Sequence, residues 1–200
     1  MLMNMAYLGL IYIFPFYGEV YLQLPPLTVG LIMIVSPVTV ALFGLPVARW
    51  SDRRGRRPFC IASGLLLVAA AVLLLVFDEQ MTVPIMVISM FLKGLGWAFV
   101  GGPMGSNLVE HARQERDMAS SLMNEAYYIG GVLGTALVAI IFAIASSSVG
   151  ADITAVSETA FISGFNAAML FVLALGVIVF LFTLTVKDQR TADRPPAEPE

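Results

Sequence analysis

Three ionisable side chains interrupt long apolar runs in this sequence: Lys93, Glu125 and Glu19. A charged group inside a hydrocarbon layer is costly, so it usually faces a water-filled cavity or a partner, where it can bind a solute or relay a proton. Lys93 lies near the middle of its apolar segment, too deep to reach water easily. A cavity-facing or paired role is therefore the favoured interpretation of Lys93.

The two carboxylates each allow two interpretations. Glu125 lies about two turns into its segment, either as a buried, proton-responsive carboxylate or as a side chain that extends to the cytoplasmic surface. Glu19 lies near the end of the first segment, where a simple interfacial position is favoured over a place on a solute pathway. The aromatic residues that either line this pathway or form interface belts are Tyr12, Tyr17, Tyr21, Tyr127, Tyr128, Trp97 and Phe165.

The composition indicates the environment of these residues. The chain has 200 residues, of which 58% are hydrophobic and 12% are charged. A water-soluble chain of this length needs more charged residues to cover its surface. The apolar runs are about twenty residues long, the length that a helix needs to cross the hydrocarbon core. The sequence therefore predicts an integral membrane protein.

The positions of the apolar runs predict an all-α membrane protein with six transmembrane helices. Prolines within the first two runs are compatible with this, because helices in a membrane tolerate proline when neighbours satisfy the freed carbonyl groups. A charged, proline-containing tail at 187–200 is predicted to be disordered. The helices are expected at about 2–22, 27–48, 58–77, 82–104, 118–145 and 162–186, which together form one bundle over 1–186.

The basic residues predict the orientation of the bundle. Ten of the eleven Lys and Arg residues, all but Lys93, lie in the predicted loop at 49–57, the predicted loop at 106–117 or the tail. Lys and Arg beside spanning helices accumulate on the cytoplasmic side. Both termini are therefore expected in the cytoplasm, and the membrane is expected to be the cell (plasma or inner) membrane.

The residue inventory argues against an enzyme. His111 is the only histidine and Cys60 the only cysteine, so neither a catalytic triad nor a metal-ligand cluster is expected. The glycine-rich run at 101–105 lacks the lysine and the strand-loop-helix setting of a phosphate-binding loop. No cofactor, metal or nucleic-acid partner is expected.

Glycines spaced four residues apart on one helix face predict close helix packing. The two pairs are Gly101 with Gly105 and Gly130 with Gly134, and Gly131 lies beside the second pair. Small residues at this spacing allow two helices in a membrane to approach closely. Plain packing and a sliding surface for a conformational change both need this arrangement, so both interpretations stay open.

The basic loop carries a motif of specific spacing. Asp52-Arg53-Arg54-Gly55-Arg56-Arg57, preceded four residues earlier by Ala48, resembles the motif between the second and third helices of each half of the major facilitator superfamily. The family pattern has glycine at the position of Ala48. The alternative is a basic loop that only fixes the orientation of the chain in the membrane. The aspartate and the glycine at these spacings favour the resemblance to the family.

The resemblance implies that Asp52 faces the start of a neighbouring helix, at about 118–121, where a carboxylate is favoured. It also implies that the arginines pair with nearby acids and hold the cytoplasmic side closed. The candidate acids are Glu110, Glu115 and Asp117.

Two further stretches, 121–134 and 21–37, resemble the fourteen-helix drug:proton antiporters of this superfamily, in regions of their C-terminal half. The resemblance implies secondary transport by alternating access, in the form of proton-coupled efflux of drugs or small amphipathic solutes. The implied partners are the lipid bilayer, a small-molecule substrate, protons and a second six-helix half.

The size of the chain leaves an alternative function open. Transport by alternating access needs two bundles, and this chain supplies one. It can be part of a longer or split transporter, or it can pair with itself. The alternative is a non-transporting truncated or accessory membrane protein that associates through helix packing.

Overall fold

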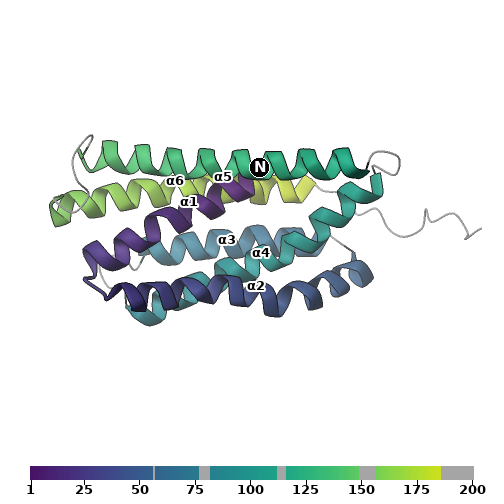
Figure 1. Cartoon of the computed structure of the whole chain (residues 1–200), viewed down its shortest axis with the longest axis horizontal. Coiled ribbons are helices and arrows are strands. Elements are labelled where there is room, and N and C mark those ends of the chain that lie inside the picture. The colour runs from purple at the N-terminus through teal and green to yellow at the C-terminus, as the bar shows by residue number, and fades with distance from the viewer. Residues whose placement is uncertain (56, 77–81, 112–115, 149–155, 186–200) are drawn as a thin grey trace, which may run out of the picture.

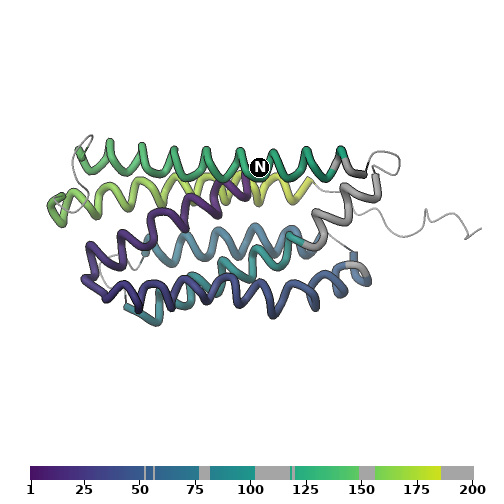
Figure 2. The backbone as a smooth tube through the Cα atoms, viewed as in Figure 1, coloured from purple at the N-terminus to yellow at the C-terminus, as the bar shows by residue number. Residues whose placement is uncertain are grey.

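The computed structural model describes residues 1–55, 57–76, 82–111, 116–148 and 156–185, with side chains for all of these except 52, 102–111, 116, 117 and 119 (Figures 1 and 2). These residues form an all-helical bundle, which confirms the predicted six-helix fold class. The elements are α1 (Leu2–Phe16), the π-helical turn η1 (Tyr17–Tyr21), α2 (Pro26–Arg54), α3 (Arg57–Val76), α4 (Val83–His111), α5 (Arg116–Ala145) and α6 (Glu158–Thr185).

Helices α2 to α6 each contain a stretch long and apolar enough to cross a membrane. Helix α1 is shorter, with 15 residues, but the five-residue turn η1 follows it without a break. π-helical turns are rare, and they often occur at functional sites. The chain is thus an integral membrane protein with five candidate spans in its described part.

The basic segment is more helical than the sequence predicts. Helix α2 does not end near Ala48 but continues through Arg54, and α3 starts at Arg57, so the expected loop at 49–57 is mostly helix. Gly55 ends α2 with φ 93°, a conformation that residues with a side chain rarely adopt. The end of α2 is therefore set by the glycine of the motif rather than by the loss of hydrophobicity.

The other helix ends also differ from the prediction. Helix α4 continues to His111 and α5 begins at Arg116, so much of the expected loop at 106–117 is helical. Helix α6 begins at Glu158, earlier than expected. Polar residues continue a helix beyond the hydrocarbon layer at little cost, because only glycine and proline strongly oppose helix formation. The predicted tail at 187–200 lies outside the described residues.

The helices form two layers of three (Figure 1). Helix α1 packs against α5 and α6, whereas α4 packs against α2 and α3, and the layers meet mainly where α3 contacts α6. If α1, α2 and α3 are exchanged with α4, α5 and α6 in this order, the contacts of α1 with α5 and α6 become the contacts of α4 with α2 and α3. The bundle thus has the packing pattern of an internal structural repeat, as many transporter folds do.

Glycines allow α1 and α5 to lie in close contact. A Cβ atom built on Gly134 would collide with the backbone of Met5, and one built on Gly130 would collide with the backbone of Met1. Gly131 lies against the side chains of Leu8 and Asn4. Any side chain at Gly130 or Gly134 would push the two helices apart.

The other predicted pair does not make such a contact in the described part of the chain. Nothing described lies within 4 Å of a Cβ atom built on Gly101. Gly105 lies among the residues whose side-chain surroundings are not described. The packing of Gly101 and Gly105 therefore stays a prediction, and within the described part of the chain α4 meets its neighbours at Gly94 and Gly96.

Candidate functional site

The structure separates the three predicted ionisable residues. Lys93, on α4, is buried with 1% of its surface exposed. Glu19, on η1, and Glu125, on α5, are both exposed on the bundle. No ion pair joins either carboxylate to Lys93 among the described residues, whose only buried charged side chain is Lys93.

The surroundings of Lys93 are aromatic and hydroxylic. Its Nζ atom lies 4.0 Å from the ring centroid of Tyr7 on α1, in a cation–π arrangement. The hydroxyl group of Tyr7 forms a hydrogen bond of 3.0 Å with Oγ of Ser36 on α2. Within the described part of the chain, Nζ of Lys93 has no hydrogen-bond partner.

The cation–π contact offsets only part of the cost of burying this charge. Such a contact contributes up to about 2 kcal/mol when it is shielded from water. Removing an ammonium group from water costs several kcal/mol, even after the protein relaxes. The site therefore favours any group that supplies a hydrogen-bond acceptor or a negative charge to Lys93.

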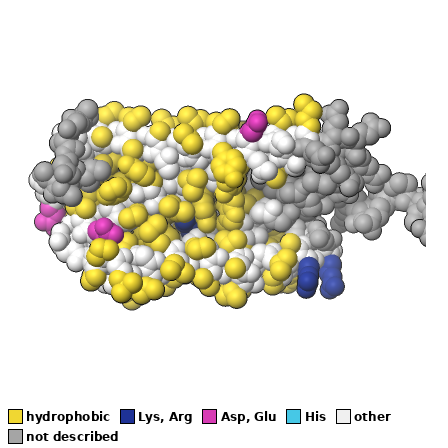
Figure 3. All heavy atoms as spheres, in the orientation of Figure 1, with side chains coloured by type: hydrophobic (Ala, Val, Ile, Leu, Met, Phe, Trp, Pro, Cys, Tyr) yellow, Lys and Arg dark blue, Asp and Glu magenta, His cyan; other side chains and the backbone are white. Residues whose placement is uncertain are grey.

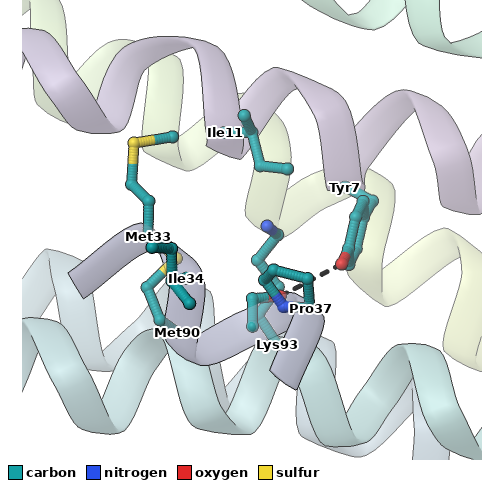
Figure 4. A pocket seen from close by; sticks show the side chains of 8 residues that line it. Tyr7, Ile11, Met33, Ile34, Pro37, Met90 and Lys93 are labelled. Carbon is teal, nitrogen blue, oxygen red and sulfur yellow. Dashed lines mark hydrogen bonds between the residues drawn. The ribbon is translucent and has the colours of Figure 1, made fainter. Parts of the chain in front are cut away.

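A pocket of about 350 Å³ opens beside Lys93 (Figure 4). Tyr7 and Lys93 lie on one side of this pocket, while Met33, Ile34 and Met90 lie on the other. The volume is in the range of small-molecule sites, which combine apolar walls with a few polar groups. Residues from α1, α2 and α4 line it: Tyr7, Ile11, Met33, Ile34, Ser36, Pro37, Met90 and Lys93.

Gly94 positions Lys93 against α2. A Cβ atom on Gly94 would stand 2.6 Å from the carbonyl oxygen of Ser36 and 2.8 Å from Cβ of Thr39. Only glycine therefore allows α4 to approach α2 this closely. This close approach places Lys93 beside the hydrogen bond between Tyr7 and Ser36.

Pro37 adds a backbone feature to the pocket wall. It lies inside the continuous helix α2 and has no N–H group, so the carbonyl group of Met33 loses its normal helical donor. Both Pro37 and Met33 line the pocket. The wall contributed by α2 thus contains a proline at a point where the helix lacks one backbone hydrogen bond.

A row of rings connects the pocket to α5. Tyr7 packs against Trp97 with 4.6 Å between ring centroids, and Trp97 contacts Tyr127 at 5.4 Å. Nδ2 of the buried Asn4 donates a 2.6 Å hydrogen bond to the carbonyl oxygen of Tyr127. The residues close to Lys93 thus link α1, α4 and α5.

Other aromatic residues predicted for the solute pathway do not line this pocket. Tyr17 and Phe165 are buried in the core, with 4.2 Å between their ring centroids. Tyr128 is exposed on α5. Tyr7, which contacts Lys93 directly, was not predicted, and neither were Ser36 and Gly94. No local pattern marks these residues, because they lie on different helices and meet only in the folded bundle.

The basic motif lies at one end of the bundle, where Arg side chains stand at the edge of a largely hydrophobic face (Figure 3). The guanidinium group of Arg54 lies 4.7 Å from the ring centroid of Trp50. Nη2 of Arg57 donates a 3.4 Å hydrogen bond to the carbonyl oxygen of Leu184, in the last turn of α6. A cation is favourable at this end of a helix.

The predicted partners of the motif cannot be placed. Ala48 lies within α2 and Arg53 is exposed. The side chain of Asp52 and the whole of Arg56 lie outside the described residues. So do the side chains of the three candidate acids, Glu110, Glu115 and Asp117. Their pairing therefore stays a prediction.

Comparison with known proteins identifies relatives. The sequence matches the Major Facilitator Superfamily over residues 1–200. The multidrug efflux pump LfrA of Mycolicibacterium smegmatis is 28% identical over 137 residues, which cover 68% of this chain and 27% of the pump. The chain thus matches well under two thirds of the length of this relative. No solved structure matches the chain.

Proposed function

Because the chain belongs to the major facilitator superfamily, we propose that it forms one six-helix half of a secondary transporter that exports small amphipathic solutes in exchange for protons. Family membership makes it a transporter component for small substrates rather than an enzyme. The direction, the coupling ion and the position as C-terminal half are the parts that we propose. Similarity to a multidrug efflux pump supports export.

The observation that carries the proposal is the buried ammonium group of Lys93 beside a pocket between α1, α2 and α4. An ionisable side chain within a membrane span is costly to remove from water, and such side chains mark substrate or proton pathways. Transporters bind their substrates near the midplane of the membrane, between two bundles that move relative to each other. Lys93 is our candidate for substrate contact, and Glu125 and Glu19 are candidates for the proton pathway.

Transport by this mechanism requires a second bundle. It can come from further residues of the same protein, from another chain or from a second copy of this one. In this proposal the basic motif closes the cytoplasmic side. The contact of Arg57 with the end of α6 supports a role in joining helix ends there.

The first experiment determines the mass and composition of the native particle that contains this chain, extracted from membranes in mild detergent. A particle with two six-helix bundles is expected. A lone six-helix bundle would favour the alternative, a non-transporting accessory membrane protein.

The second experiment measures flux by the intact particle in everted membrane vesicles that hold a pH gradient. Addition of a transported solute is expected to release protons, which restores the fluorescence of a dye quenched by the gradient. Anionic, neutral and cationic amphipathic solutes are compared. Absence of a response to every solute, in a particle with two bundles, would contradict the proposal.

A further inference from the structure

We infer that the pocket beside Lys93 binds small amphipathic acids, with the carboxylate of the ligand paired to the Lys93 ammonium group. This rests on the proposed function, because it names the class of solute that the transporter would carry. It concerns binding alone, however, so binding and flux can be tested separately.

The first step of the argument is charge balance. Lys93 is the only buried charged side chain among the described residues, and its Nζ atom has no hydrogen-bond partner there. The Tyr7 ring covers one side of the ammonium group at 4.0 Å. An ammonium group has three donors, and a ring face does not satisfy them. A carboxylate supplies both the missing acceptors and the missing charge.

The second step is the arrangement of polar and apolar groups in the pocket. Lys93 lies on one side together with Tyr7, whose hydroxyl group is bonded to Ser36. Met33, Ile34 and Met90 form an apolar wall on the other side (Figure 4). A ligand that has an acidic group at one end and an apolar body at the other matches this division. The volume of about 350 Å³ limits the ligand to a small molecule.

The third step is access. A carboxylate from a second bundle is the rival partner for Lys93. With only 1% of its surface exposed, Lys93 lies below the surface of the bundle. The pocket of about 350 Å³ beside it has room for a small free solute. The binding experiment below distinguishes a carboxylate on the ligand from a carboxylate on a second bundle.

The experiment measures affinities by titration calorimetry with the purified native particle. Three probes share one apolar body and differ in charge: 4-phenylbutyrate, 4-phenylbutanol and 4-phenylbutylamine. Charge-assisted hydrogen bonds are stronger than neutral ones. We therefore expect the acid to bind about tenfold tighter than the alcohol, or more, and the amine to bind most weakly.

Variants of α4 assign this preference to Lys93. In Lys93→Met, the preference for the acid over the alcohol should fall to less than about twofold, while the alcohol binds as before. Lys93→Arg should retain a preference for the acid. Ser89→Ala is the matched control, because Ser89 is a buried polar residue of the same helix that bonds to the carbonyl oxygen of Met86 and does not line the pocket. This control should behave like the wild type.

Several results would overturn the inference. The first is equal binding of the acid and the amine by the wild type, which is expected if a second bundle neutralises Lys93. The second is a preference for the acid that survives in Lys93→Met. The third is the absence of binding of any of the three probes. Binding of the acid without flux would contradict export but support the inference. Flux of solutes by a particle that binds the acid no more tightly than the alcohol would support export but contradict the inference.

Discussion

At the scale of single residues, the main feature of the molecule is the buried ammonium group of Lys93, which has no ion pair or hydrogen bond with the described residues. Lys93 is held by Gly94, which lets α4 approach α2, and by the ring of Tyr7. A buried charge of this kind lowers stability in exchange for function, because apolar side chains of similar size would fill the same space at lower cost. A substitution of Lys93 tests this interpretation, and a substitution of Glu125 tests the separate proposal of a proton pathway.

Lys93→Met should stabilise the ligand-free particle and impair transport. The substitution removes the cost of burying the ammonium group and keeps most of the side-chain volume, so we expect a gain of about 1–3 kcal/mol in the free energy of unfolding. Thermal unfolding of the purified particle measures the gain, and proton release in vesicles measures transport. A lower melting temperature would mean that Lys93 has a stabilising partner outside the described residues.

Glu125→Gln should leave the stability of the bundle unchanged and reduce proton release. Glu125 is exposed on α5 and makes no ion pair with a described residue, so its removal costs the isolated bundle little. A carboxylate within a membrane span is typical of proton relays. The measurement is solute-induced proton release in vesicles, with Ser89→Ala as control. Unchanged release would place Glu125 at the cytoplasmic surface instead.

At the scale of elements, the fold depends on where two helices can touch and where a helix is interrupted. Glycines bring α1 against α5 and α4 against α2. Prolines inside α1 and α2 remove helical hydrogen bonds within the membrane. The first feature sets the distance between helices, and the second removes a backbone hydrogen bond of α2 at Pro37, which lines the pocket.

Gly134→Ala should destabilise the bundle. The new methyl group would collide with the backbone of Met5, and overpacking of this kind costs about 1–3 kcal/mol. Gly30→Ala is the matched control, because no atom of the described residues lies within 4 Å of its Cβ position and alanine favours a helix over glycine. Thermal unfolding of both variants is the measurement. Equal effects of the two substitutions would show that α1 and α5 can separate without cost.

Pro37→Ala should weaken binding at the pocket without reducing membrane insertion. Alanine restores the N–H group that the carbonyl group of Met33 lacks and removes the ring from the pocket wall. Pro46→Ala is the control in the same helix, because Pro46 does not line the pocket. We expect a loss of about threefold to tenfold in the affinity for 4-phenylbutyrate at Pro37 alone, since shape and a hydrogen bond change together. Equal losses at both prolines would indicate an effect on α2 as a whole.

At the scale of the whole molecule, the two layers of helices place the basic motif and the start of α6 at opposite ends. Arg57 contacts the last turn of α6 at Leu184, so Glu158, in the first turn of this helix, lies at the other end. Basic residues next to spanning helices favour the cytoplasmic side. The motif should therefore face the cytoplasm.

Labelling of introduced cysteines tests this orientation. In intact cells, a membrane-impermeant maleimide should label Glu158→Cys but label Arg53→Cys only after permeabilisation. Both positions are exposed. The wild type serves as background, because its only cysteine, Cys60, is buried. The reverse pattern would invert the topology and with it the proposed role of the motif.

The sequence by itself determined the membrane class, the number of helices and the family resemblance, and it singled out Lys93 as a charge within an apolar run. These features depend on local composition: a long apolar run can only be a helix in a membrane, and a charge within such a run stands out. The family resemblance came from a motif in which one glycine, Gly55, has a conformation that few other residues adopt.

The tertiary structure decided what surrounds the charge. Tyr7, Ser36 and Gly94 come from three helices and meet at Lys93 only in the folded bundle. It also separated Glu19 and Glu125 from that site and extended α2 to Arg54. Hydrophobic periodicity could not reveal these facts, because a helix in a membrane is apolar on all sides. Which face meets a neighbour depends on close packing between distant segments of the chain.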